Sequence, residues 1–159
     1  AFVEIKKKIK GVVYKRREGL PYKRAVNYLS GLEQGGDSQI FHELDWFLEF
    51  YGDLQPAMLL SYNRQSYKGI DDGSVRITFD KDILWRTESL DVVDGIWGKP
   101  LFDPDQRLME VKIRGAMPLW LSHIMAQLKI YPHSFSKYGT AYQTWVRQEM
   151  CKREEKQYV

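Results

Sequence analysis

Residues 59–67 read LLSYNRQSY and residues 75–80 read VRITFD, two short stretches in which polar and apolar side chains alternate. Successive side chains of a β-strand point to opposite faces. One face of these stretches therefore carries Arg64 and Arg76, and we expect the two strands to form a hairpin through a turn at residues 69–73. The opposite face carries the apolar side chains of Val75, Ile77 and Phe79.

The same alternation recurs in residues 2–10 (FVEIKKKIK), 12–17 (VVYKRR) and 108–114 (LMEVKIR). A solvated strand face explains such a pattern in one strand, but agreement across five segments favours a shared basic face. A face of Lys and Arg with a few carboxylates suits a ligand that carries several phosphates together with a divalent metal, because Arg matches phosphate oxygens in pairs. Besides the two arginines, this face carries Glu4, Lys6, Lys8, Lys15, Arg17, Tyr62, Asp80, Glu110 and Lys112.

Length and composition indicate one domain, residues 1–159. The net charge is only +3, which is too small an excess to argue for a nucleic-acid-binding protein. No apolar run approaches membrane-spanning length. Cys151 is the only cysteine, so an internal disulfide is excluded and a reducing compartment is favoured.

Helical periodicity predicts four helices, at residues 21–35, 38–51, 118–128 and 138–152, and a short further strand at residues 83–87. Asp37 or Ser38 could cap the second helix, and Gly52 ends it. Strands with one polar and one apolar face, covered by helices, predict an α+β fold. Its centre would be an antiparallel β-barrel with a wet interior and helices packed outside.

Five motifs then occur in one order along the chain: FVEIKKK, SYNRQSY, SVRITFD, LMEVKIRGAMPLWL and HSFSKYGTAY. This ordered set resembles the VTC domain, the polyphosphate-polymerase type within the CYTH or triphosphate tunnel metalloenzyme superfamily, and is most similar to its short bacterial members. The resemblance implies a triphosphate tunnel fold. The family's initial Arg-x-Arg strand has no counterpart here, so we expect the chain to correspond to the C-terminal two-thirds of the family domain.

The resemblance also implies roles for individual residues. The expected catalytic residues, which grip phosphate, are Lys6, Arg64, Arg76 and Lys137. Further expected phosphate ligands are Lys15, Arg17, Tyr62 and Lys112. Glu110 is the expected ligand for Mn²⁺ or Mg²⁺, with Glu4 as a second candidate, and Asp80 is expected to be a strand-end or pairing residue.

The function that follows is an ATP-dependent inorganic polyphosphate polymerase, with ATP and polyphosphate or triphosphate as ligands. Two alternatives stay open: a triphosphatase of the same superfamily and a non-catalytic polyphosphate-binding module. We expect no nucleic-acid partner and a cytoplasmic location. Association with a membrane through a membrane-protein partner that receives the product stays open.

Overall fold

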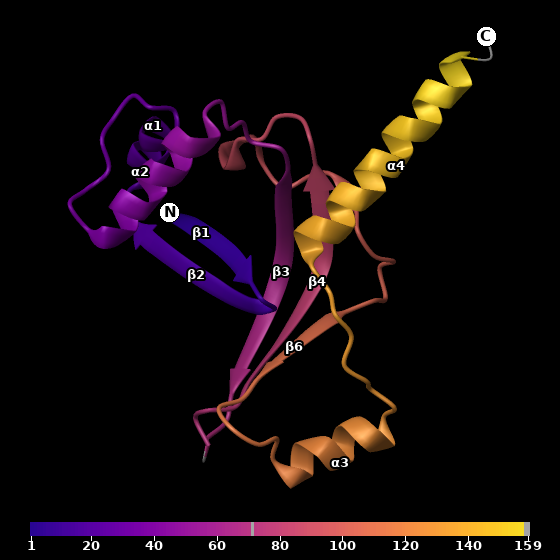
Figure 1. The fold of residues 1–159 in the computed structure, drawn as a ribbon. Helices are drawn as coiled ribbons and strands as arrows, with labels where there is room; N and C mark the ends of the chain where they lie inside the picture. The colour runs from indigo at the N-terminus through magenta and orange to yellow at the C-terminus, as the bar shows by residue number, and fades with distance from the viewer. Residues whose placement is uncertain (71, 158–159) are drawn as a thin grey trace. The chain divides into compact units, whose positions relative to one another are not determined.

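The computed structural model describes residues 1–70 and 72–157, with side chains through Cys151. Asp71, in the expected turn, lies outside the described residues. The chain forms two compact units, Ala1–Gln55 and Pro56–Val159. Each unit combines helices with antiparallel strands, so the predicted α+β class is confirmed (Figure 1).

The first unit begins with an antiparallel hairpin of β1 (Phe2–Ile9) and β2 (Val12–Gly19). Lys10 and Gly11 form its turn, with φ angles of 48° and 84°. Two positive φ angles in a two-residue turn match the right-handed twist of the flanking strands, which explains the tight connection. The predicted hairpin is therefore confirmed.

Two helices complete this unit, α1 (Tyr22–Leu29) and α2 (Gln39–Tyr51). Ser38 caps α2, because its hydroxyl accepts a hydrogen bond from the backbone N–H of Phe41. The first helix is shorter than predicted: it ends at Leu29, and the apolar residue Leu32 beyond it is 80% exposed. The buried core of the unit comprises Val3, Ile5, Leu20, Ala25, Tyr28, Phe41 and Leu44.

The second unit contains a four-stranded sheet built around β4 (Arg76–Arg86). Strand β3 (Leu59–Lys68) pairs with β4 along one side. On the other side β4 pairs with β5 (Lys99–Pro100) at one end and with β6 (Leu108–Lys112) at the other. All of these pairings are antiparallel.

Strand β4 contains a β-bulge that the sequence pattern did not predict. Instead of two strands at residues 75–80 and 83–87, one strand continues through Asp82, which has a φ of 52°. Asn63 of β3 is opposite Lys81 of β4, and Ser61 is opposite Leu84. Between these two pairs β4 has two residues where β3 has one. One extra residue therefore exchanges the faces on which odd and even side chains of β4 lie.

The remaining elements are a 3₁₀ turn, η1 (Val92–Asp94), and the helices α3 (Leu119–Gln127) and α4 (Lys137–Gln157). Helix α4 is longer than the predicted 138–152. On α3 only Leu121 is buried, whereas Trp120 and Ile124 are exposed.

The predicted basic face is present within each unit. Cross-strand partners include Lys6 with Lys15, and Arg64 with Asp80. Among the described residues the strands form two open sheets, so closure into a barrel remains a prediction. The opposite face is less buried than expected: Val75 is buried, whereas Ile77, Phe79, Met109, Val111 and Ile113 are half-buried.

Candidate phosphate-binding site

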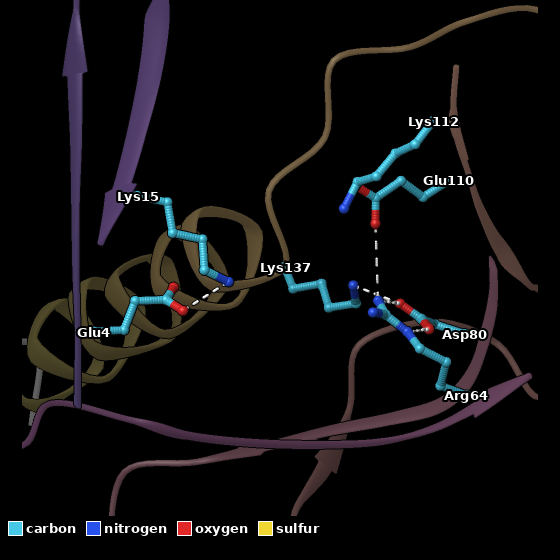
Figure 2. A network of polar contacts seen from close by, with 7 residues as sticks. All are labelled: Glu4, Lys15, Arg64, Asp80, Glu110, Lys112 and Lys137. Carbon is cyan, nitrogen blue, oxygen red and sulfur yellow. Dashed lines mark hydrogen bonds and ion pairs between the residues drawn. The ribbon is translucent and has the colours of Figure 1, made fainter. Parts of the chain in front are cut away.

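Asp80 is the centre of a charged cluster on the polar face of the four-stranded sheet. Its carboxylate is fully buried. Arg64 donates to both carboxylate oxygens, from Nε to Oδ1 at 2.6 Å and from Nη2 to Oδ2 at 2.8 Å. Lys137 Nζ lies 2.6 Å from Oδ2. Figure 2 shows the two cations meeting on the one carboxylate.

Sheet register and a helix start bring these three residues together. Arg64 and Asp80 are direct partners across β3 and β4, so their side chains leave the same face. Lys137 is the first residue of α4. The Ser136 hydroxyl accepts a hydrogen bond from the backbone N–H of Gly139 at 3.1 Å, which fixes the start of the helix and with it the position of Lys137.

Tyr62 supports both cations. The guanidinium of Arg64 lies 5.2 Å and the Lys137 ammonium 4.6 Å from the centroid of the Tyr62 ring. Cations are attracted to the electron-rich face of an aromatic ring at such distances. In this structure Tyr62 therefore packs against the expected phosphate ligands and positions them.

The charges of this cluster reinforce one another. Hydrogen bonds from Arg64 hold the pKa of Asp80 below its usual value, with Lys137 acting in the same direction and burial opposing them. The hydrogen bond to Asp80 likewise raises the pKa of Arg64. The ion pair is consequently retained across the physiological pH range.

Glu110 lies at the edge of the same cluster. It is on β6 opposite Thr78, with Oε1 3.0 Å from Lys112 Nζ and Oε2 3.9 Å from Arg64 Nη2. Its side chain is 43% exposed, in contrast to the buried Asp80. The structure therefore brings together Arg64, Lys137, Glu110 and Lys112 of the predicted set.

Arg76 is on the same face but does not join this cluster. It pairs with Lys68 on β3 and with Lys112 on β6, four residues along β4 from Asp80. At a rise of about 3.3 Å per residue, this separates the two positions by about 13 Å.

The other predicted residues belong to the first unit and share one face of the β1–β2 hairpin. Lys15 Nζ lies 2.6 Å from Glu4 Oε2, and the guanidinium of Arg17 lies 4.4 Å from the ring centroid of Phe2. Lys6 is opposite Lys15 and is exposed. The second metal candidate, Glu4, thus has a lysine as its partner.

Sequence reasoning understated Asp80 and missed Lys68 and Arg114. Asp80 is a pairing residue as expected, but it holds two of the predicted phosphate ligands at once. The register of the predicted hairpin could have identified Asp80, because it places an acidic residue directly opposite Arg64 on a basic face. Lys68 and Arg114 continue the same alternation at the ends of β3 and beyond β6.

Glu110 and its neighbour Thr78 fit a hard divalent cation. The buried Thr78 Oγ1 has no hydrogen-bond partner among the described residues, and Thr78 is the cross-strand partner of Glu110. Mg²⁺ and Mn²⁺ take oxygen ligands and commonly combine one protein carboxylate with phosphate oxygens. No group of three or more His, Cys, Asp or Glu side chains suited to a metal occurs within residues 1–70 and 72–151.

The family model of the VTC domain matches residues 1–146, which include the first unit, most of the second and every predicted site residue. The chain belongs to the VTC domain family. No curated protein and no solved structure matches it. VTC domains are associated with polyphosphate metabolism, which agrees with the charged face of this VTC domain. None of its described helices is long and apolar enough to cross a membrane.

Proposed function

We propose that this VTC domain is a polyphosphate polymerase that transfers the γ-phosphate of ATP to a growing chain of inorganic polyphosphate. The observation that carries the proposal is the convergence of Arg64 and Lys137 on Asp80, in a chain that matches the VTC family model. The cations come from different elements and are held in one place before any ligand arrives.

Preorganised cations are what phosphoryl transfer requires. The reaction asks the protein to align the attacking and leaving oxygens and to stabilise charge on the transferred phosphoryl group. Asp80 engages Nε and Nη2 of Arg64, which leaves Nη1 and the remaining protons of the Lys137 ammonium to donate to a phosphate. The buried carboxylate therefore orients the two cations without exhausting their donors.

Glu110, whose cross-strand partner is Thr78, would hold Mg²⁺ or Mn²⁺ together with the phosphate oxygens. Such an ion neutralises charge on bridging phosphate oxygens. The partial exposure of Glu110 leaves its carboxylate accessible for this use. Lys6, Lys15 and Arg17 on the hairpin are proposed as further phosphate ligands.

The test is incubation of the chain with ATP and Mn²⁺, followed by phosphorus NMR, which separates internal chain phosphates from orthophosphate. We expect a growing signal from internal phosphates. Arg64→Ala should lower its rate at least about 100-fold, as for loss of a group that stabilises developing charge. Arg64→Lys keeps a counter-charge for Asp80 and should still lose most activity, because Lys lacks the planar fork.

Arg147→Ala is the matched control, since Arg147 is an exposed arginine on α4. It should leave the rate unchanged. Orthophosphate as the sole product would indicate a triphosphatase. Polyphosphate binding without turnover would indicate a non-catalytic binding module. Either result would contradict the proposal.

A further inference from the structure

A pocket with aromatic walls lies at the end of β4, where β5 and α4 meet this strand. Its volume is about 580 Å³, within the range of pockets that bind small molecules. Three of its nine lining residues are tryptophans: Trp85 on β4, Trp97 just before β5 and Trp145 on α4. Three indole rings in this tryptophan pocket favour a planar ligand that can stack on them.

The charged side chains of the tryptophan pocket balance one another. Arg86 and Lys99 supply two positive charges, and Glu88 and Glu149 supply two negative charges. A phosphate group is bound by an excess of positively charged donors, which this pocket does not offer. The part of a ligand that enters the pocket is therefore expected to be uncharged.

Both cations of the pocket are also engaged within the chain. The guanidinium of Arg86 donates to backbone carbonyls of the loop after β4 and lies 4.5 Å from the ring centroid of Trp97. The Lys99 ammonium donates to Gln148 Oε1 on α4 at 2.8 Å and lies 5.2 Å from the ring centroid of Trp85. A cationic ligand would compete with these side chains for the indole rings, so the pocket is not suited to it.

The polar groups of the tryptophan pocket suit a heterocycle that both donates and accepts hydrogen bonds. The carboxylates of Glu88 and Glu149 are acceptors, and the hydroxyl of Thr87 is a donor as well as an acceptor. A purine base presents an exocyclic amino group as a donor and ring nitrogens as acceptors. A purine is thus planar, uncharged and complementary to these side chains.

The tryptophan pocket is on the same face of the sheet as the cations Arg64 and Lys137. Trp85 is opposite Leu60, four residues along β3 from Arg64, so about 13 Å separates the two positions. Helix α4 gives a similar spacing independently, because Trp145 is eight residues after Lys137, about 12 Å along the helix axis. A strand and a helix therefore both lead from the cations to the pocket.

We propose that the tryptophan pocket binds the purine base of the nucleotide whose phosphates are held by Arg64 and Lys137. The inference rests on the proposed function for the identity of that nucleotide as ATP. Its phosphates and ribose span the distance between the cations and the pocket. Trp145 is the residue on which the base stacks, because its ring, unlike those of Trp85 and Trp97, has no cation over it among the described residues.

The test compares ATP, tripolyphosphate and adenosine as probes in calorimetric titrations with Mg²⁺. In Trp145→Ala the ratio of ATP affinity to tripolyphosphate affinity should fall about tenfold, the scale of one base stacked on an aromatic ring. Only ATP carries a base, so tripolyphosphate affinity should not change. Adenosine should lose affinity by the same factor as ATP. Trp145→Phe keeps an aromatic ring and should restore most of the ratio.

Trp120→Ala is the matched control, because Trp120 is an exposed tryptophan on α3 that does not line the pocket. It should leave the ratio unchanged, and thermal melting should show that the variants are folded. Glu88→Ala alters an exposed pocket residue, so it tests the site without removing a packed ring, and it should lower the ratio in the same direction.

Three results would overturn the proposal. The first is a loss of ATP and tripolyphosphate affinity by the same factor in Trp145→Ala. The second is an unchanged ratio in both Trp145→Ala and Glu88→Ala. The third is adenosine binding that depends on Trp145 while the ratio does not, which would assign the pocket to a nucleoside other than that of the substrate.

The two proposals fail separately. Absence of chain phosphates in the NMR experiment would refute the polymerase, yet a fall of the ratio in Trp145→Ala would still establish the base site, because binding needs no turnover. Conversely, an active polymerase whose ratio of ATP to tripolyphosphate affinity ignores Trp145 and Glu88 would refute the base site alone.

Discussion

Asp80 shows how one buried carboxylate can organise a basic surface. Two cations on a water-exposed face would repel each other and adopt many rotamers. Between them, Asp80 neutralises the repulsion and fixes both side chains through short hydrogen bonds. Because the carboxylate is inaccessible to solvent, these contacts are weakly screened by salt.

Asp80→Asn should destabilise the chain by about 2 kcal/mol at neutral pH, because it removes charge-assisted hydrogen bonds while keeping the side-chain shape. The pKa of Asp80 is lowered in the folded state, so the stability it contributes is present above its unfolded pKa of about 3.9 and is lost as pH falls through the folded value. The difference in urea stability between parent and variant should therefore be constant near pH 7 and vanish in strong acid.

Asp105→Asn, at an exposed position in the same unit, should leave the urea midpoint unchanged at every pH. A difference that persisted undiminished at the lowest pH would mean that the effect of Asp80→Asn comes from packing and not from charge.

At the scale of elements, strand alternation was sufficient to predict the polar face and to place Asp80 on it as a strand-end or pairing residue, but not to predict its partner Arg64. It could not predict the bulge, because Asp82 adopts a positive φ that its type permits but does not demand. The end of α1 was likewise set by tertiary context, since the helix ends before the apolar residue Leu32. Periodicity also did not show that most apolar residues of α3 stay exposed.

Arg86 holds the loop that leads from β4 to β5. It is 3% exposed, and its guanidinium donates to the backbone carbonyls of Ser89, Asp91, Gly95 and Trp97 at 2.8–3.2 Å. Its guanidinium also lies 4.5 Å from the ring centroid of Trp97. One planar fork thus donates hydrogen bonds to backbone carbonyls at four points of the loop.

Arg86→Lys should therefore destabilise the second unit by about 3 kcal/mol, since an ammonium keeps the charge but cannot reach all four carbonyls. Relative to the parent chain, the Arg86→Lys variant should show faster hydrogen exchange in residues 87–98 and unchanged exchange in the hairpin of the first unit. Arg107→Lys provides the comparison, because Arg107 also donates to backbone carbonyls but is exposed. Equal effects of the two substitutions would refute a special role for Arg86.

At the scale of the whole molecule, the net charge does not show where the positively charged side chains lie. An excess of three positive charges predicts weak attraction to any polyanion. A cleft at one end of the four-stranded sheet is nevertheless lined by four cations, Lys68, Arg76, Lys112 and Arg114. The ordered motifs were sufficient to predict the family. The separation of the Asp80 cluster from the row of Lys68, Arg76 and Lys112 required the register of three strands, which alternation alone does not give.

Polyphosphate affinity should consequently fall steeply between low and physiological salt, because exposed cations are screened over about 8–10 Å. The Lys68→Gln/Arg114→Gln variant should show a shallower dependence, whereas the melting temperature of both proteins should change little with salt. Titrations at several chloride concentrations measure this. Parallel slopes for parent and variant would contradict a contribution of the cleft to binding.

The bulge at Asp82 makes the two ends of the polar face chemically different. Up to Asp80 the even-numbered side chains of β4 line this face, but beyond the extra residue Trp85 lies opposite Leu60, on the side that Arg64 shares. This face thus changes from the row of Lys68, Arg76 and Lys112 at one end to the buried indole of Trp85, with the Lys99 ammonium over it, at the other. A one-residue irregularity in a single strand thereby decides which end of this face presents a continuous row of cations.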